Sequence, residues 1–139
     1  MNSSLTEIGI HAVETVQAEN ARALLRELES ALQQLIENGE TTRIDLGSLP
    51  LNPADYELLE NVLGHGEVIA SVDSLGVSEI SDTSIPGIWR VEYYNNEEVL
   101  VAEFIEVTRC PELLQTPEEE IKDGLLALRA ATTRYENEE

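Results

Sequence analysis

Aromatic residues and cysteine are scarce in this chain of 139 residues. One Trp, one Phe and one Cys are present, and aromatic residues make up only 4% of the sequence. The single cysteine, Cys110, excludes a disulfide within the chain and a metal cluster built from several thiolates of one chain. A core must therefore consist mainly of Leu, Ile and Val. Hydrophobic residues make up 42%, which is enough for a core and too many for a disordered chain.

Basic residues are also few. The chain has 8 Lys and Arg residues and 28 Asp and Glu residues, so the formal net charge is −20. A chain with this charge repels phosphate backbones and anionic lipid headgroups, and we expect neither nucleic acid nor a membrane surface as a partner. The charge favours solubility, or a partner that presents a basic patch.

Long apolar runs are missing as well. No segment approaches the ~20 apolar residues of a membrane span. Residues 1–10 lack the basic residues and the apolar run of a signal peptide. With the single cysteine, these features predict a protein of the reducing cytoplasm.

Three segments have a helical pattern. Apolar residues recur at three- and four-residue steps over residues 14–37, and Gly39 is a typical stop. A second helix is expected from Asn52 as the cap and Pro53 in the first turn. A third follows residue 116, with Thr116 as the expected cap, Pro117 as the first residue and acidic residues in the first turn.

Alternating patterns predict strands between these helices. They are "TRIDL" (residues 42–46), "EVIASVDSL", the weaker "VSEISDT", and a hairpin in "GIWRVEYYNNEEVLVAEFIEV". The hairpin is expected to turn at Asn95-Asn96, because Asn tolerates positive φ. The order predicts an α+β fold with a largely antiparallel sheet of about four to five strands and about three helices. We expect one domain over residues 1–139, with residues 1–12 and 136–139 frayed.

Two residues could support chemistry. His65, between two glycines in "LGHGEV", reads either as a ligand or acid–base group on an open turn or as an ordinary polar residue of that turn. Cys110 follows Arg109, which could lower the thiol pKa, but a packed cysteine fits equally. His11 receives no role. We find no phosphate loop, metal spacing or catalytic constellation, and expect no enzyme activity, metal or cofactor.

Three motifs occur in a familiar order. "LGHGEVIASV" (residues 63–72) is followed by "ISDTSIPGIWRVEYY" (residues 80–94) and "EVTRCPELL" (residues 106–114). Together they resemble the HupH/HyaF family of hydrogenase expression proteins, with Ile88 where the family has Val and Asp82 where it has Glu. Many members are longer and contain a second related half.

The resemblance implies an accessory protein, or assembly chaperone, for maturation of the nickel–iron uptake hydrogenase. Its implied partner is the small iron–sulfur subunit or the precursor of that subunit, before export. Two alternatives remain open on the residues. One is a small cytoplasmic enzyme that uses Cys110 or His65, and the other is a dimeric interaction module, a homodimer paired through an exposed strand edge.

Two segments are the candidates for partner contact. We expect Trp89 to serve the core, and the turn and loop before it to meet the partner. The candidate residues are Gly64, His65, Gly66, Glu67, Asp82, Thr83, Ile85, Pro86, Gly87 and Trp89.

Overall fold

The structure is a computed structural model that describes residues 17–73 and 76–138. The chain divides into two compact units, Met1–Arg109 and Cys110–Glu139. The described part of the first unit contains helices α2 (Glu19–Asn38) and α3 (Pro53–Leu63) and all five strands. The second contains the short helix η2 (Glu112–Leu114) and the long helix α4 (Glu118–Asn137). Within the described ranges, no helix is long and apolar enough to cross a membrane.

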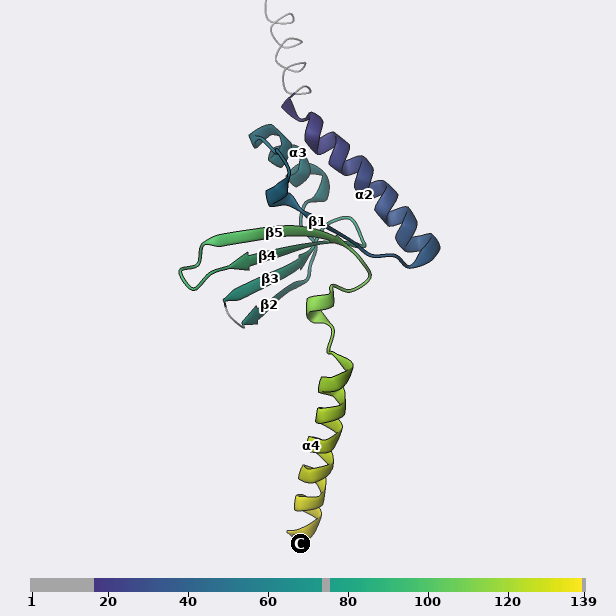
Figure 1. Cartoon of the computed structure of the whole chain (residues 1–139), viewed down its shortest axis with the longest axis vertical. Coiled ribbons are helices and arrows are strands. Elements are labelled where there is room, and N and C mark those ends of the chain that lie inside the picture. The colour runs from purple at the N-terminus through teal and green to yellow at the C-terminus, as the bar shows by residue number, and fades with distance from the viewer. Residues whose placement is uncertain (1–16, 74–75, 139) are drawn as a thin grey trace, which may run out of the picture. The chain divides into compact units, whose positions relative to one another are not determined.

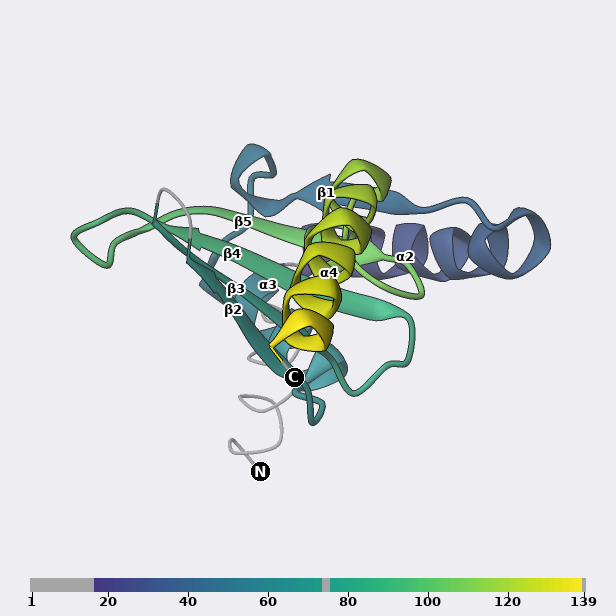
Figure 2. The same cartoon turned by 90° about the horizontal axis from the view of Figure 1, so that it is seen from below.

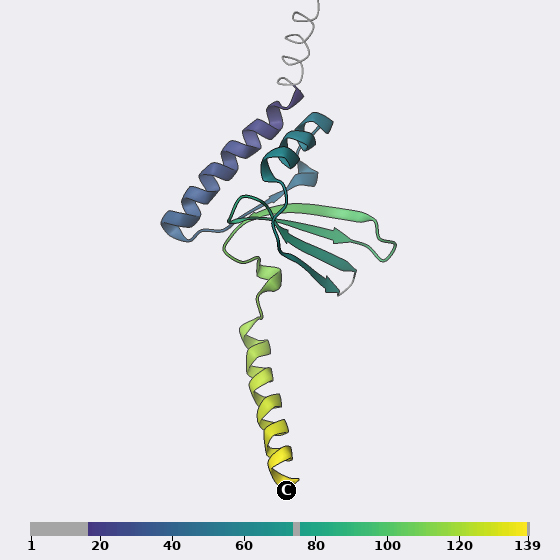
Figure 3. The same cartoon turned by 180° about the vertical axis from the view of Figure 1, so that it is seen from behind.

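The five strands form one antiparallel sheet in the order β1-β5-β4-β3-β2. Their bounds are β1 Thr42–Asp45, β2 Ile69–Asp73, β3 Val77–Asp82, β4 Ile88–Tyr94 and β5 Leu100–Val107, and a short helix η1 (Leu46–Ser48) follows β1. Helices α2 and α3 lie on the same side of this sheet (Figures 1 and 3). The predicted α+β class, the antiparallel sheet and the helix number are confirmed.

The core lies between the two helices and the sheet. Buried apolar side chains of α2 and α3 meet those of η1, β4 and β5: Ala21, Leu24, Leu28, Ala31, Leu35, Leu46, Leu59, Leu63, Ile88, Ile105 and Val107. No aromatic residue belongs to this set, as the composition predicts.

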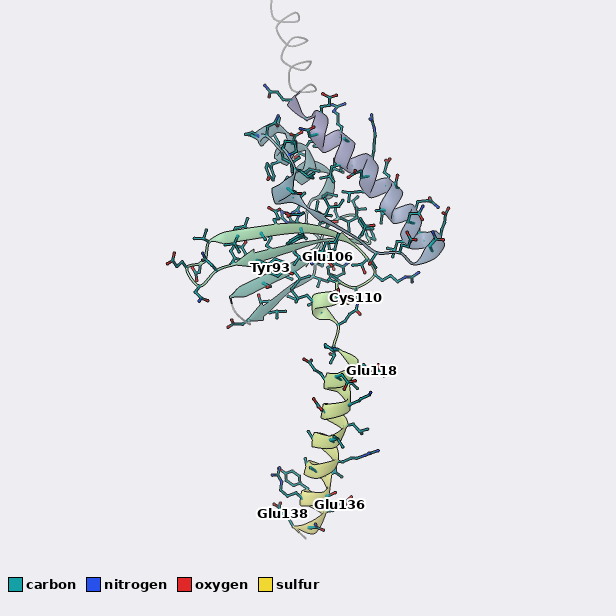
Figure 4. All side chains as sticks on the ribbon, in the orientation of Figure 1. Tyr93, Glu106, Cys110, Glu118, Glu136 and Glu138 are labelled. Atoms are coloured by element: carbon teal, nitrogen blue, oxygen red, sulfur yellow. The ribbon has the colours of Figure 1, made fainter. Side chains whose placement is uncertain are left out.

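The prediction for Trp89 needs correction. Side chains alternate across a strand, and the core receives Ile88, so Trp89 points to the other face of the sheet together with Val91 and Tyr93. Trp89 is half-buried, and its Nε1 donates a hydrogen bond to the carbonyl of Thr108 at 3.2 Å. Figure 4 marks Tyr93 on β4 and Glu106 on β5, which belong to this second face. Trp89 therefore ties β4 to the end of β5 and does not fill the core between helices and sheet.

Two local details also differ from the predictions. The β4–β5 hairpin forms, but Glu98 has the positive φ of 63°, whereas the Asn95 side chain accepts hydrogen bonds from the N–H groups of Glu97 and Val99. At α4, Pro117 occupies the N-cap and Thr116 lies outside the helix, with no side-chain cap bond. The acidic first turn, Glu118–Glu120, is as predicted.

Asp55 joins the two helices that cover the sheet. Its carboxylate is fully buried and accepts a hydrogen bond from the N–H of Ala21 in α2 at 2.9 Å. It also completes a capping box with Asn52 at the start of α3. One carboxylate thus satisfies backbone donors at the N-terminal ends of both helices, where no carbonyl of the same helix can reach them.

Replacing Asp55 with Ala is expected to lower the free energy of unfolding by about 2–4 kcal/mol, because it removes a cap and leaves the buried N–H of Ala21 without an acceptor. Urea unfolding followed by circular dichroism measures the loss. Asp45→Ala, which removes the exposed cap of η1, is the control and should cost about 1 kcal/mol or less. Equal losses for the two variants would show that Asp55 does not join the helices in this way.

Candidate functional site

The two segments predicted to contact a partner lie together in the structure. The Gly64–Glu67 turn follows α3, and the loop from Asp82 to Gly87 leads from β3 into β4. The backbone N–H of Ser84 donates to the carbonyl of Leu63 at 2.6 Å, and the Ser84 hydroxyl donates to the same carbonyl at 2.7 Å. The loop therefore closes the C-terminal end of α3, and the two segments form one surface.

Asp82 holds this surface together. Its carboxylate accepts a hydrogen bond from the N–H of Val68 at 2.8 Å, and its backbone N–H donates to the carbonyl of Val68 at 3.2 Å. The N–H of Gly66 donates to the carbonyl of Asp82, also at 3.2 Å. A Cβ on Gly66 would clash with the Asp82 carboxylate, so any other residue at this position must displace that carboxylate.

The loop itself is a tight turn with internal bonds. The N–H of Ile88 donates to the carbonyl of Ile85 across Pro86 and Gly87, and Gly87 has a φ of 96°. This is the geometry of a type II turn, which prefers Pro and Gly at its two central positions. The buried hydroxyl of Thr83 donates to the carbonyl of Ile88 at 2.8 Å. Gly87 also approaches α2 closely, because an added Cβ would lie 3.0 Å from Leu32.

These contacts divide the candidate residues into two groups. Gly64, Gly66, Asp82, Thr83, Ile85, Gly87 and Trp89 are buried, half-buried or tied into the backbone of the turn and loop. The side chains of His65, Glu67 and Pro86 are exposed, although His65 also contacts Glu60 and Pro86 occupies a central position of the turn. The side chains that this surface offers to a partner are therefore those of the second group.

A small polar cavity opens beside His65, between α3 and the sheet. Its volume is about 200 Å³, below the ~300–1,000 Å³ of typical small-molecule sites. The size suits a side chain more than a cofactor. Apolar and charged residues both line it: Leu46, Tyr56, Leu59, Glu60, Leu63, His65, Arg90, Glu92, Glu103 and Ile105.

Arg90 is the buried cation of this cavity. Only 9% of the residue is exposed, and its Nη2 lies 3.1 Å from Oε2 of Glu60. The other carboxylate oxygen of Glu60 lies 2.5 Å from Nε2 of His65. The carboxylate thus stands between the guanidinium and the imidazole, and it links α3, the following turn and β4. Removing Glu60 would leave Arg90 buried without its charged partner.

Three acidic residues lie in register with one another across the sheet, two positions along β4 from Arg90. Glu92 of β4 pairs with Glu79 of β3 on one side and with Glu103 of β5 on the other, so all three project from the face that α3 covers. Burial raises the pKa of Glu103, and the neighbouring Glu92 raises this pKa further, whereas Arg90 lowers it. The hydrogen bond that Tyr94 donates to Glu92 at 2.6 Å, together with burial and the nearby carboxylates, raises the pKa of Tyr94 to about 12.

The sequence analysis did not identify Arg90, Glu60, Glu92 or Glu103 as site residues. Arg90 could have been noticed as a cation on a strand next to the Trp89 motif. Its burial depends on α3, which lies far away in sequence. Cys110 is exposed and belongs to the second unit, and its Sγ lies 3.7 Å from the carbonyl of Pro111. Among the described residues, no group of three or more His, Cys, Asp or Glu could hold a metal ion.

Replacing Gly66 with Ala should cost about 1–2 kcal/mol, because the new methyl group displaces the Asp82 carboxylate from the N–H of Val68. In a background that already contains Asp82→Ala, the same change should cost much less. A double-mutant cycle based on urea unfolding measures the coupling. Additive losses would mean that the turn excludes a side chain for another reason.

Glu103→Gln is expected to raise the melting temperature at pH 7. Burial holds the pKa of Glu103 in the folded chain above its usual value of 4.5. The folded chain therefore binds more protons in the pH window between the two values, and stability falls as the pH rises through that window. The gain should therefore shrink as the pH falls toward 4.5. Glu97→Gln in the exposed hairpin turn removes the same charge and is the control. An equal rise in melting temperature for Glu97→Gln would show that the burial of Glu103 is not the cause.

Comparison with known proteins supplies the family. Residues 18–135 match the family described as "HupH hydrogenase expression protein, C-terminal conserved region". The chain is 36% identical over 112 residues to the hydrogenase expression/formation protein HupQ of Azotobacter chroococcum mcd 1, covering 79% of this chain and 39% of that protein. HupH of Rhodobacter capsulatus is 34% identical over 110 residues, covering 79% of this chain and 40% of that protein. The chain thus spans well under half of the length of these curated relatives.

A solved structure agrees with the sequence match. The hydrogenase expression protein HupH from Thiobacillus denitrificans ATCC 25259 superposes with a TM-score of 0.75 at 37% identity, covering 83% of this chain and 96% of that one. The resemblance that the three motifs indicated is thereby confirmed. The chain belongs to the HupH family of hydrogenase expression proteins, and it contains the C-terminal conserved region of that family.

Proposed function

We propose that this protein assists the maturation of a nickel–iron uptake hydrogenase as a binding protein of the cytoplasm, without catalysing a reaction. The observation that carries the proposal is the family match over residues 18–135. Relatives that share this region are named hydrogenase expression/formation proteins. Its client in this proposal is the small, iron–sulfur subunit before export.

The geometry of the candidate site supports binding over chemistry. Arg90 and His65 both lie against the Glu60 carboxylate, and Asp82 is occupied by the backbone of β2. Polar groups that hold one another in this way stiffen a surface. A rigid surface loses less conformational entropy when a partner binds.

The exposed residues of the joined turns are the proposed point of contact. His65, Glu67 and Pro86 project from two segments that are fixed to each other by Ser84 and Asp82. The surrounding negative charge, within a net charge of −20, favours a client surface rich in Lys and Arg, such as the twin-arginine leader of an exported precursor.

The test is capture of the small-subunit precursor by the tagged chain at low salt, with the mature small subunit and the large subunit as alternatives. The precursor should be retained, and His65→Ala, Glu67→Gln and Pro86→Ala together should weaken capture about tenfold, as for a cluster of contact residues. Circular dichroism checks that the triple variant is folded, because Pro86 occupies a turn position and His65 contacts Glu60.

A matched control changes exposed residues elsewhere in the same unit. Gln33→Ala with Glu37→Gln on α2 removes one hydrogen-bonded surface pair and should not affect capture. Retention of the large subunit alone would contradict the proposed client. Unchanged capture of the precursor by the folded triple variant would exclude the joined turns as the contact.

A further inference from the structure

Strand β2 forms one edge of the sheet and is open along its outer side. It is last in the order β1-β5-β4-β3-β2, and no strand among the described residues pairs with that side. Figures 1 and 3 show β2 at the margin of the sheet, away from β1. In the view of Figure 2, β2 is again the outermost strand beside β3.

The pairing with β3 fixes which backbone groups point outward. The N–H of Asp82 donates to the carbonyl of Val68, so Val68 directs its groups toward β3. Bonding alternates along an antiparallel strand. Ala70 and Val72 therefore also face β3, and Ile69, Ser71 and Asp73 direct their N–H and C=O groups away from the sheet.

The first four residues of β2 have no charged side chain and no proline to protect this edge. Native edges are blunted by charged side chains, prolines or short length. The opposite edge, β1, has four residues and includes Arg43 and Asp45. Strand β2 has five residues and no proline, its single charged residue is Asp73 at the C-terminal end, and Ile69 is 72% exposed. An aliphatic, β-branched side chain at an open edge is a site for another strand.

The charge beside this edge indicates what kind of strand could bind there. Glu103 of β5, Glu92 of β4 and Glu79 of β3 lie side by side in one row across the sheet. The next position in this row, on β2, is the small residue Ser71. No Lys or Arg occurs in the sequence between Arg43 and Arg90. A second copy of this chain would bring the same negative row, whereas a cationic strand would neutralise it.

We propose that the outer edge of β2 binds an extended cationic segment of another protein as a sixth strand of the sheet. An aliphatic side chain of the added strand lies beside Ile69. Two positions away, a Lys or Arg lies beside Ser71 and reaches over it toward Glu79, two strand spacings or about 10 Å from the added backbone. The surface and the chemistry of its ligand are independent of which protein supplies the strand.

The probe is a fluorescein-labelled synthetic octapeptide with Val and Lys alternating at odd positions and Thr at even positions. Fluorescence anisotropy at low salt should show saturable binding, with weaker binding as salt is raised. In the paired strand, the Val and Lys residues direct their N–H groups toward β2 and the Thr residues direct theirs outward. N-methylation at Val and Lys should therefore abolish binding, and N-methylation at Thr should be tolerated.

Matched variants locate the site on the protein. Ile69→Lys should weaken binding about tenfold or more, since a charged side chain blocks an edge. Ile36→Lys on α2 is the control, because Ile36 is 73% exposed and the charge change is identical. Glu79→Gln should weaken binding more than Glu97→Gln in the hairpin turn. All four variants should keep the melting temperature and circular dichroism of the parent.

Several outcomes would overturn the proposal. They are no saturable binding of the octapeptide, equal affinity of its two N-methylated forms, and equal affinity of Ile69→Lys and Ile36→Lys. Sedimentation that reveals a dimer dissociated by Ile69→Lys would assign the edge to a second copy instead. If the parent chain binds the octapeptide but does not capture the small-subunit precursor, the proposed function is wrong and the edge proposal is unaffected.

Discussion

The carboxylate of Asp82 is the constraint on which the candidate surface depends. It accepts the N–H of Val68 at the entry to β2, and the backbone of the same residue exchanges two further bonds with the turn after α3. These bonds fix the register between β2 and β3, and they bring the carboxylate so near Gly66 that a side chain there must displace it. The turn after α3, the open edge strand and the loop into β4 are therefore all tied to one residue, through its carboxylate and its backbone.

The face of the sheet under the helices has two chemical characters. Near α2 it is apolar, where Ile88, Ile105 and Val107 pack in the core. Toward the β4–β5 hairpin turn this face becomes charged. Arg90 follows Ile88 along β4, and Glu92 with its partner Glu103 lies nearer the turn. The short helix α3 spans this boundary, because Leu59 and Leu63 enter the core and Glu60 pairs with Arg90. The ion pair joins the buried Arg90 to a half-exposed carboxylate, and such a pair adds less to stability than apolar packing would.

Local sequence signals predicted where helices and strands form. Long-range contacts determine which face of the sheet is covered and which polar residues are buried, and the sequence did not predict these. The stop at Gly39 and the Asn52–Pro53 start of α3 depend on neighbouring residues, and both occur as predicted. Strand periodicity correctly grouped Trp89, Val91 and Tyr93 on one face, but it cannot tell which face the helices cover. The same ambiguity concealed Arg90, whose partner Glu60 lies on another element. Similarly, the two candidate turns were identified, but only their contacts separate the structural Gly66 and Asp82 from the exposed His65 and Glu67.

The uneven distribution of charge connects the cavity, the turns and the edge strand. Between Arg43 and Arg90 the chain places acidic residues on α3, on the following turn and on β3 without a Lys or Arg among them. Burial, with the nearby Glu92 and Glu60, raises the pKa of the half-buried Glu103 on β5, so a charged Glu103 costs stability. A fold that tolerates this cost retains a field that attracts cations over about one Debye length, roughly 8–10 Å at physiological salt. Because the field lies beside an open strand without a basic residue, a cationic segment would gain electrostatic attraction and backbone hydrogen bonds in the same place.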